Sequence, residues 1–288
     1  MPLYDLHSHS SASDGELSPS ELIQRASSRQ VNVLALTDHD TTAGLVEAHR
    51  ENQRLENPMT LIDGVEISSS WHNFDIHIVG LMVDIENKKF QRFLAGQRQK
   101  RTDRALEIGR RLEKAKMLGA YEGAKKLAGD AAISRAHFAR WMVEQGYVKN
   151  MNAVFSKYLV RGKTGYVPNQ WADITDVIQQ IHDAGGVAVL AHPSRYKMTT
   201  KWLRRLLKDF CSAGGDGMEV TFAQQTMADK QLLLTLAKEF NLYTSLGSDF
   251  HAPSPWVDLG KNLHVSEQYP WIWKSSRWQE KITELEYV

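Results

Sequence analysis

Short apolar segments that each run into a potential metal ligand recur along this chain and constrain its fold more than any other feature. The first, residues 3–6, leads into His7 and His9, whose side chains point to the same face of an extended segment. Later segments carry Ser13-Asp14-Gly15, Thr37-Asp38-His39-Asp40, Gly64-Val65-Glu66, His77, Ala191-His192-Pro193 and Ser248-Asp249-Phe250-His251. One His-x-His pair is a common surface coincidence, but this series predicts a shared metal site.

The pattern around these motifs alternates between strands and helices. Apolar strands are expected at residues 31–36, 60–67, 75–81, 187–190, 217–220 and 242–246, with a last strand at 257–265. Ser18-Pro19-Ser20-Glu21 is a capping box with proline at the first helical position, so a helix should begin there. Such alternation is typical of a parallel α/β sheet or barrel. Active sites of barrels form at the C-terminal strand ends, where nearly every potential ligand falls.

Between residues 96 and 164 the alternation stops and the pattern becomes helical. Helices are expected at 98–117, at 135–144 with Ser134 as its cap, and after a cap at Asn152. Residues 101–163 hold 14 lysines and arginines against 6 acidic residues, although the whole chain has a net charge of only +1. We therefore expect a barrel formed by residues 1–95 and 165–288, with a basic α-helical insertion at 96–164. The insertion favours a polyanionic ligand, and a solvated basic helix face is the alternative.

Composition excludes a membrane protein and a disulfide scaffold. No apolar run approaches the roughly 18 residues of a membrane helix, and the first residues lack a signal-peptide pattern. The single cysteine, Cys211, cannot form an internal disulfide and is interpreted as a packed thiol. We expect a cytoplasmic monomer with no membrane partner. Residues without motif context are interpreted as structural, namely His49, His72, His182 and His264, together with Trp202, Trp256 and Trp271 at core-like positions.

Nine residues are candidate metal ligands: His7, His9, Asp14, His39, Glu66, His77, His192, Asp249 and His251. Imidazole and carboxylate groups together suit zinc, manganese or iron better than calcium. One ion takes about four to six ligands including water, so nine protein ligands imply two or three divalent ions, with Glu66 as the natural bridge. Paired ions stabilise the attacking and leaving oxygens of phosphoryl transfer. Asp38 and Asp40 flank His39 and are candidates to orient a metal ligand, with helix capping by Asp40 as the alternative.

Taken in order, these motifs resemble those of the PHP (polymerase and histidinol phosphatase) family of metal-dependent phosphoesterases. The resemblance covers most of the chain and implies a distorted (β/α)7-type PHP barrel. It also implies a site for three ions, and manganese is the favoured metal. The first ion would be held by His7, His9, Glu66 and Asp249, the second by Glu66, His77 and His192, and the third by Asp14, His39 and His251. Asp14 departs from members with histidine there. The implied catalytic group is a metal-activated hydroxide at the first set.

Several stretches are most similar to the PHP branch that dephosphorylates nucleoside 3',5'-bisphosphates and removes nucleotides from short RNA in the 5'→3' direction. They are the two N-terminal motifs, Gly64-Val65-Glu66-Ile67-Ser68, His77-Ile78-Val79-Gly80-Leu81, Arg161-Gly162-Lys163-Thr164-Gly165-Tyr166 and Gly247-Ser248-Asp249-Phe250-His251.

By this resemblance Arg135, Arg161 and Lys163 hold the phosphate that is not cleaved, and Arg195, close to His192, is a further substrate-binding candidate. The implied partner is a nucleotide bisphosphate or a short 5'-phosphorylated RNA. Two alternatives stay open. One is a histidinol-phosphatase-like enzyme acting on a small molecule, and the other is a non-catalytic, metal-stabilised module that binds RNA.

Overall fold

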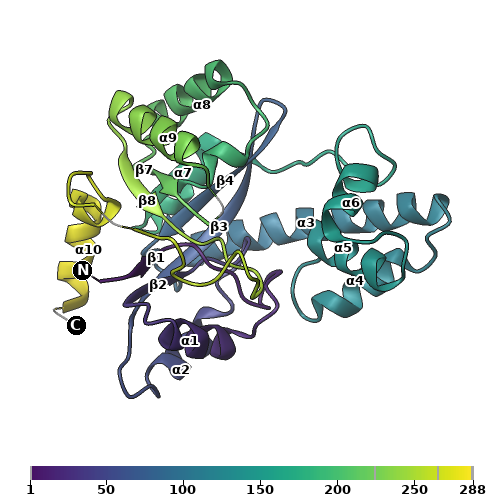
Figure 1. The fold of residues 1–288 in the computed structure, drawn as a ribbon, viewed down its shortest axis with the longest axis horizontal. Coiled ribbons are helices and arrows are strands. Elements are labelled where there is room, and N and C mark those ends of the chain that lie inside the picture. Colours follow the sequence, from purple (N-terminus) through teal and green to yellow (C-terminus); the bar gives the residue numbers. More distant parts are fainter. Residues whose placement is uncertain (1, 224, 265, 287–288) are drawn as a thin grey trace.

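The computed structural model describes residues 2–223, 225–264 and 266–286, and consists of a strand barrel with a helical lobe on one side (Figure 1). The strands are β1 (Tyr4–Asp5), β2 (Val33–Leu36), β3 (Thr60–Trp71), β4 (Phe74–Leu81), β5 (Ala172–Asp173), β6 (Val187–Leu190), β7 (Gly217–Thr221) and β8 (Tyr243–Leu246). The helices are α1 (Pro19–Ser28), α2 (Leu45–Asn52), α3 (Lys88–Lys114), α4 (Ala120–Ala128), α5 (Arg135–Glu144), α6 (Met151–Val154), α7 (Ile174–Asp183), α8 (Thr200–Ser212), α9 (Met227–Glu239) and α10 (Ser276–Glu286).

Seven strands follow one another around the barrel in the order β1-β2-β3-β4-β6-β7-β8, while the short β5 pairs with β3 outside this path. The circle nearly closes, because the Leu6 N–H donates to the Leu246 carbonyl at 3.2 Å and Ser8 forms a parallel bridge with Phe250. All four residues of β6 are fully buried, as expected for a barrel strand covered on both faces. The expected fold class, a seven-stranded α/β barrel of the PHP type, is confirmed.

One strand runs against the expected parallel direction. β4 is antiparallel to both β3 and β6, so residues 60–81 form a hairpin instead of two parallel strands joined by a helix. The turn contains only His72 and Asn73, too short for the crossover that parallel strands require. His72 has a φ of 49°, which a two-residue hairpin turn demands of its first residue.

The helical lobe is built on the second half of α3, a helix of 27 residues. Its first half packs Phe90 and Leu94 into the barrel core, and its second half packs Ile108 and Leu112 into a separate apolar cluster with α4, α5 and α6. The helix begins ten residues before the expected start at residue 98, because Asn87 caps it there. Asn150, not the expected Asn152, caps α6, which continues into a π-helix at Phe155–Leu159.

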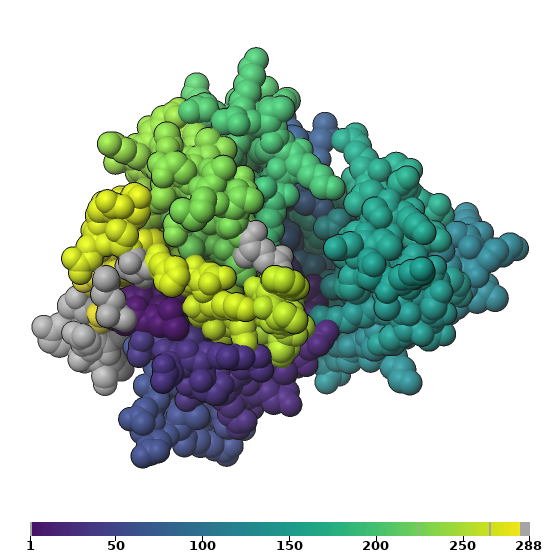
Figure 2. Space-filling view, viewed as in Figure 1, coloured from purple at the N-terminus to yellow at the C-terminus, as the bar shows by residue number. Residues whose placement is uncertain are grey.

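A hollow separates the lobe from the body of the barrel (Figure 2).

Asp5 and Asp258 organise the loop after β8 on the barrel side: Asp5 accepts from the Gly260 N–H, and Asp258 pairs with Arg25. These side-chain contacts replace the strand expected at 257–265, since residues 257–264 form turns and irregular backbone. Val265 lies outside the described residues. Trp256, expected at a core-like position, is 70% exposed on this loop.

No helix in the described ranges is long and apolar enough to cross a membrane.

Candidate metal centre

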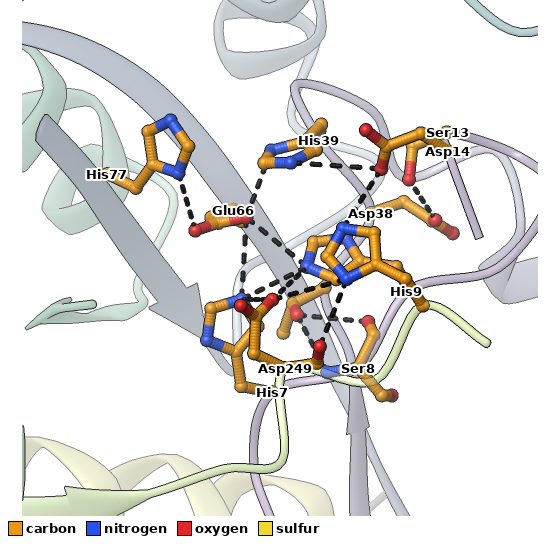
Figure 3. Close-up of polar contacts among 12 residues, drawn as sticks. His7, Ser8, His9, Ser13, Asp14, Asp38, His39, Glu66, His77 and Asp249 are labelled. Carbon is orange, nitrogen blue, oxygen red and sulfur yellow. Dashed lines mark hydrogen bonds and ion pairs between the residues drawn. The ribbon is translucent and has the colours of Figure 1, made fainter. Parts of the chain in front are cut away.

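All nine predicted ligands converge at one end of the barrel. Figure 3 labels all of them except His192 and His251. Most follow directly after a strand, as expected: His7 and His9 after β1, His39 after β2, His192 after β6, and Asp249 after β8. Glu66 and His77 are exceptions to the strand-end expectation, because they lie within β3 and β4. The long β3–β4 hairpin extends past the barrel rim, so interior positions of both strands still face the centre.

The first predicted ligand set forms a compact cage of buried atoms. His9 Nε2 lies 3.1 Å from Asp249 Oδ1 and 3.3 Å from Glu66 Oε2. His7 Nε2 lies 3.4 Å from each of the same two oxygens. Four ligands bound tetrahedrally at about 2.1 Å from one ion would be about 3.4 Å apart. The cage therefore has the dimensions of a single divalent-ion site.

Glu66 connects this cage to the other predicted ligands. Its Oε1 lies 2.8 Å from His77 Nδ1 and 3.0 Å from His192 Nε2, while its Oε2 lies 2.9 Å from His39 Nδ1. Glu66 is completely buried and central to the cluster. A carboxylate with both oxygens facing different histidines has the geometry required of a bridge between ions.

The third predicted set lies on the other side of His9. His251 Nε2 is 3.3 Å from Asp14 Oδ1, and His39 Nε2 is 3.8 Å from the same oxygen. His9 belongs to this group as well as to the first, and its ring stacks on His251 with centroids 4.2 Å apart. The ligand groups thus share His9, His39 and Glu66 instead of dividing cleanly into three sets.

Unpaired buried atoms show what kind of group the cluster fits. Five side-chain atoms here are buried without a hydrogen-bond partner: His9 Nδ1, Asp14 Oδ1, His39 Nδ1, Glu66 Oε2 and His192 Nδ1. Buried polar groups are rarely left unsatisfied, since each costs about 1–3 kcal/mol. His39 Nδ1 and Glu66 Oε2 lie within 2.9 Å of one another without hydrogen-bond geometry. A divalent cation is the partner that Asp14 Oδ1, Glu66 Oε2 and His39 Nδ1 fit, because each of these atoms faces another candidate ligand.

The electrostatics keep the carboxylates charged. Burial raises the pKa of Glu66, but His39, His77 and His7 outweigh it and hold the pKa well below its usual range. The pKa of Asp14 and that of Asp249 are likewise lowered by neighbouring histidines. The acidic ligands are therefore ionised, which is the state in which carboxylates coordinate metal.

Residues behind the ligands fix their orientation. Glu219 in β7 is buried, and its Oε1 lies 2.7 Å from His7 Nδ1 while its Oε2 accepts the His192 N–H at 2.6 Å. A carboxylate on the outer nitrogen of a ligating histidine fixes the ring and its tautomer. The sequence motifs did not indicate Glu219, although a lone acid inside the apolar segment 217–220 was an available signal.

Two aspartates next to His39 hold the ligand loops. Asp38 accepts from the Ser10 N–H at 2.8 Å and from both the Ser10 and Ser13 hydroxyls. Asp40 accepts from Arg101 Nε of α3 at 2.6 Å and from the Ser68 N–H at 2.9 Å. The buried Asp40–Arg101 pair attaches the helical lobe directly to the metal centre. Both aspartates therefore support the ligands, and neither side chain caps α2.

A cavity of about 200 Å³ opens from the centre towards the lobe. Its lining combines three kinds of residue: the ligands Asp14, His39, His77 and His251, the cations Arg101, Arg104 and Arg135, and apolar side chains that include Ile108, Ile133, Phe155 and Trp171. Arg104 and Arg135 share a single carboxylate, Asp75, at 3.8 Å and 3.6 Å. Burial and the nearby Arg135 lower the pKa of Arg104 to about 10. The two positive charges of this pair are therefore balanced by only one nearby carboxylate.

The predicted substrate-binding residues are placed differently from one another. Arg135, the first residue of α5, lines the cavity, whereas the sequence did not distinguish Arg104 from the other cations of α3. Arg195 contacts the ligand Asp249 and lies over Phe222. Arg161 and Lys163 are exposed on the turn after the π-helix, and neither belongs to the described cavity lining.

Comparison with known proteins identifies the family. The PHP domain matches residues 5–189. The 5'-3' exoribonuclease Rnm of Salmonella typhimurium is 49% identical over 96% of this chain and 94% of its own length. A 3',5'-nucleoside bisphosphate phosphatase of Chromobacterium violaceum is 43% identical, over 94% of this chain and 93% of its own. A solved Chromobacterium violaceum structure, described as an amidohydrolase with bound sulfate and no metal, has a TM-score of 0.90 and 41% identity over 98% of this chain and 96% of that one. The chain belongs to the PHP domain family.

Proposed function

We propose that the protein is a metal-dependent phosphoesterase that hydrolyses nucleoside 3',5'-bisphosphates and removes nucleotides from the 5' end of short RNA. One observation carries this proposal: a single cavity joins the ligand cluster to the under-neutralised pair Arg104 and Arg135. A simple phosphate ester needs only the metal centre, whereas a substrate with a second phosphate needs a second cationic group. The names of the relatives from Salmonella and Chromobacterium describe these two activities.

The nine ligands would hold two or three divalent ions, and we favour manganese over iron and zinc. Bound there, the ions would supply a water of lowered pKa and neutralise charge on the phosphate being cleaved. His7, His9, Glu66 and Asp249 provide the cage in which this chemistry is centred. The role of Glu219 is to keep His7 in the tautomer whose Nε2 is free to coordinate.

The second phosphate is assigned to the lobe side of the cavity. Arg104 and Arg135 offer guanidinium groups there, and Ser134 places the N-terminus of α5 beside them, where backbone N–H groups favour an anion. We also assign Arg161 and Lys163 to this phosphate. Their turn follows the π-helix whose first residue, Phe155, lines the cavity wall. Arg195 is assigned to the phosphate at the metal centre.

The cationic lining also separates this proposal from a histidinol-phosphatase-like activity. A small amine substrate carries a positive charge, which Arg104 and Arg135 would repel. A non-catalytic, metal-stabilised module that binds RNA would use the same arginines, so turnover of substrate is the observation that separates it from this proposal. We further propose a cytoplasmic monomer. Light scattering on the purified protein would test the oligomeric state, and fractionation of cells would test the location.

The experiment compares manganese-dependent turnover of four substrates: adenosine 3',5'-bisphosphate, adenosine 5'-monophosphate, histidinol phosphate and a 5'-phosphorylated RNA oligomer. The bisphosphate and the RNA should be hydrolysed, and Asp249→Ala should abolish both reactions. Arg135→Ala should raise KM for the bisphosphate at least tenfold and for the monophosphate much less, with the exposed Arg50→Ala as matched control. Preferred turnover of histidinol phosphate would refute the proposal.

A further inference from the structure

A second basic surface lies outside the helical lobe, on the segment that follows the ligand His192. Residues 195–208 contain six lysines and arginines and no acidic residue, in a chain whose net charge is +1. Lys201, Arg205 and Lys208 occupy positions i, i+4 and i+7 of α8, and all three are exposed. Residues with this spacing share one helix face, so they form a row about 10 Å long.

The charges of this row are not neutralised within the described part of the chain. No carboxylate there lies within the 4.0 Å ion-pair distance of the three cations, whereas Arg204 on the neighbouring face pairs with Glu239 at 2.6 Å. The next acid, Asp209, accepts a hydrogen bond from Trp71 Nε1 at 2.9 Å. A row of unpaired cations raises the local concentration of a polyanion.

Aromatic rings lie beside the row, at the tip of the β3–β4 hairpin. The Trp202 ring of α8 lies 5.6 Å from the His72 ring and 5.9 Å from the Phe74 ring. The Arg205 guanidinium group lies over Trp202, 4.4 Å from the ring centroid. His72 is exposed at the hairpin turn. Aromatic faces and guanidinium planes are the surfaces on which unpaired bases stack, whatever their sequence.

Both elements lead back to the metal centre. Asp75, the neighbour of Phe74 in β4, lines the cavity, and Arg195 at the start of the basic segment contacts the ligand Asp249. In Figure 2 the hairpin lies at the upper end of the hollow between the green barrel helices and the teal lobe. His72 and Phe74 therefore lie on the same hairpin as a residue of the cavity wall, and the basic segment begins beside the metal centre.

We propose that Lys201, Arg205 and Lys208, together with the exposed ring of His72 and the half-buried ring of Trp202, form a track for single-stranded RNA beyond the nucleotide held in the cavity. This inference rests on the proposed function, because it supposes that the 5' end of the strand is at the metal centre. A nucleoside bisphosphate ends within the cavity and does not reach α8. The track therefore acts on RNA alone, through its phosphates and base faces.

The test uses the full-length protein, a fluorescently labelled 5'-phosphorylated RNA 12-mer and the double variant Lys201→Gln/Arg205→Gln. The matched control is Arg50→Gln/Lys88→Gln, which removes the same charge from exposed positions on α2 and at the start of α3. In the track variant, kcat/KM for the 12-mer should fall at least tenfold, and the salt dependence of binding should weaken by about 1.4 in log–log slope. Turnover of adenosine 3',5'-bisphosphate should stay within twofold of the wild type.

A second variant, His72→Ala, should weaken binding of the 12-mer about fivefold without changing the salt slope, since stacking is lost and no phosphate contact is removed. Equal losses in the track variant and in the control, or equal affinity for a blunt duplex of the same sequence, would overturn the track. Binding measured by anisotropy separates the two proposals. A wild type that binds RNA through Lys201 and Arg205 but hydrolyses neither substrate would refute the proposed function alone.

Discussion

Glu219 provides the sharpest test of how the metal centre is built. Its two oxygens face two buried donors, since Oε1 lies 2.7 Å from His7 Nδ1 and Oε2 accepts the His192 N–H at 2.6 Å. Glu219→Gln keeps the shape of the side chain but has only one acceptor oxygen. Its amide N–H group would face one of the two donors, so either the backbone N–H of His192 loses its acceptor or His7 adopts the tautomer whose Nε2 carries the proton.

The size of the effect follows from this lost contact. A buried donor left without an acceptor costs about 1–3 kcal/mol, and replacing the carboxylate behind a ligating histidine lowers metal affinity about 10–100-fold. That range corresponds to about 1.4–2.7 kcal/mol. Because Glu219 does not face the ligand cage, the change should appear as weaker metal binding, with activity restored at higher metal concentration.

The assay is a competition titration of manganese against a chelating indicator, with phosphate release measured at each free-metal concentration. The matched control is Glu239→Gln, which makes the same substitution at a carboxylate paired with Arg204 on the surface. The control should bind metal like the wild type. Wild-type affinity in Glu219→Gln, with the fold intact by circular dichroism, would refute the assignment of Glu219 to orienting His7.

Further predictions concern the second phosphate, the metal and the lobe. Lys163→Ala should raise KM for a nucleoside bisphosphate several-fold more than for an aryl phosphate in phosphate-release assays, and equal effects would contradict its assignment. Removing the metal from protein that was kept at a free-metal concentration of about a hundred times Kd should lower Tm by about 5 °C or more in calorimetry, because Glu66 and Asp249 lose their cation. An unchanged Tm would show that the histidines alone balance these carboxylates. Burial lowers the pKa of His137 to about 4, below its ordinary 6.5, so the unfolded chain binds the proton first as pH falls. Unfolding free energy should therefore drop between pH 6.5 and 4, by up to about 1.4 kcal/mol per unit, and less in His137→Gln; equal urea-unfolding slopes would contradict this.

The sequence was sufficient to predict that the candidate ligands cluster, because each stands near a short apolar strand and barrel topology brings strand ends together. The direction of β4 was not predicted, since two apolar runs look alike whether they are parallel or form a hairpin. The two-residue spacing at His72-Asn73 was the available signal. It implies the antiparallel pairing that carries Glu66 and His77 into the centre from within their strands.

The cavity wall was less predictable because α3 carries many cations and no pattern marks which ones are buried. Arg101 and Arg104 differ from their neighbours only through tertiary contacts: Arg101 pairs with Asp40, and Arg104 donates to the Val167 carbonyl at 3.1 Å. Trp256 shows the opposite limit. It was expected at a core-like position, but the side-chain contacts of Asp5 and Asp258 hold its loop at the surface, and Trp256 itself is exposed.

The length of α3 has a consequence for how the molecule unfolds. At about 40 Å, this one helix supplies side chains to both apolar cores, with Phe90 and Leu94 in one and Ile108 and Leu112 in the other. Fraying of the lobe would remove the support on which the Asp40–Arg101 pair depends, and melting of the barrel would leave half of the helix without a core. The two cores should therefore behave as one cooperative unit, with amide exchange protection along α3 reporting global opening at both ends.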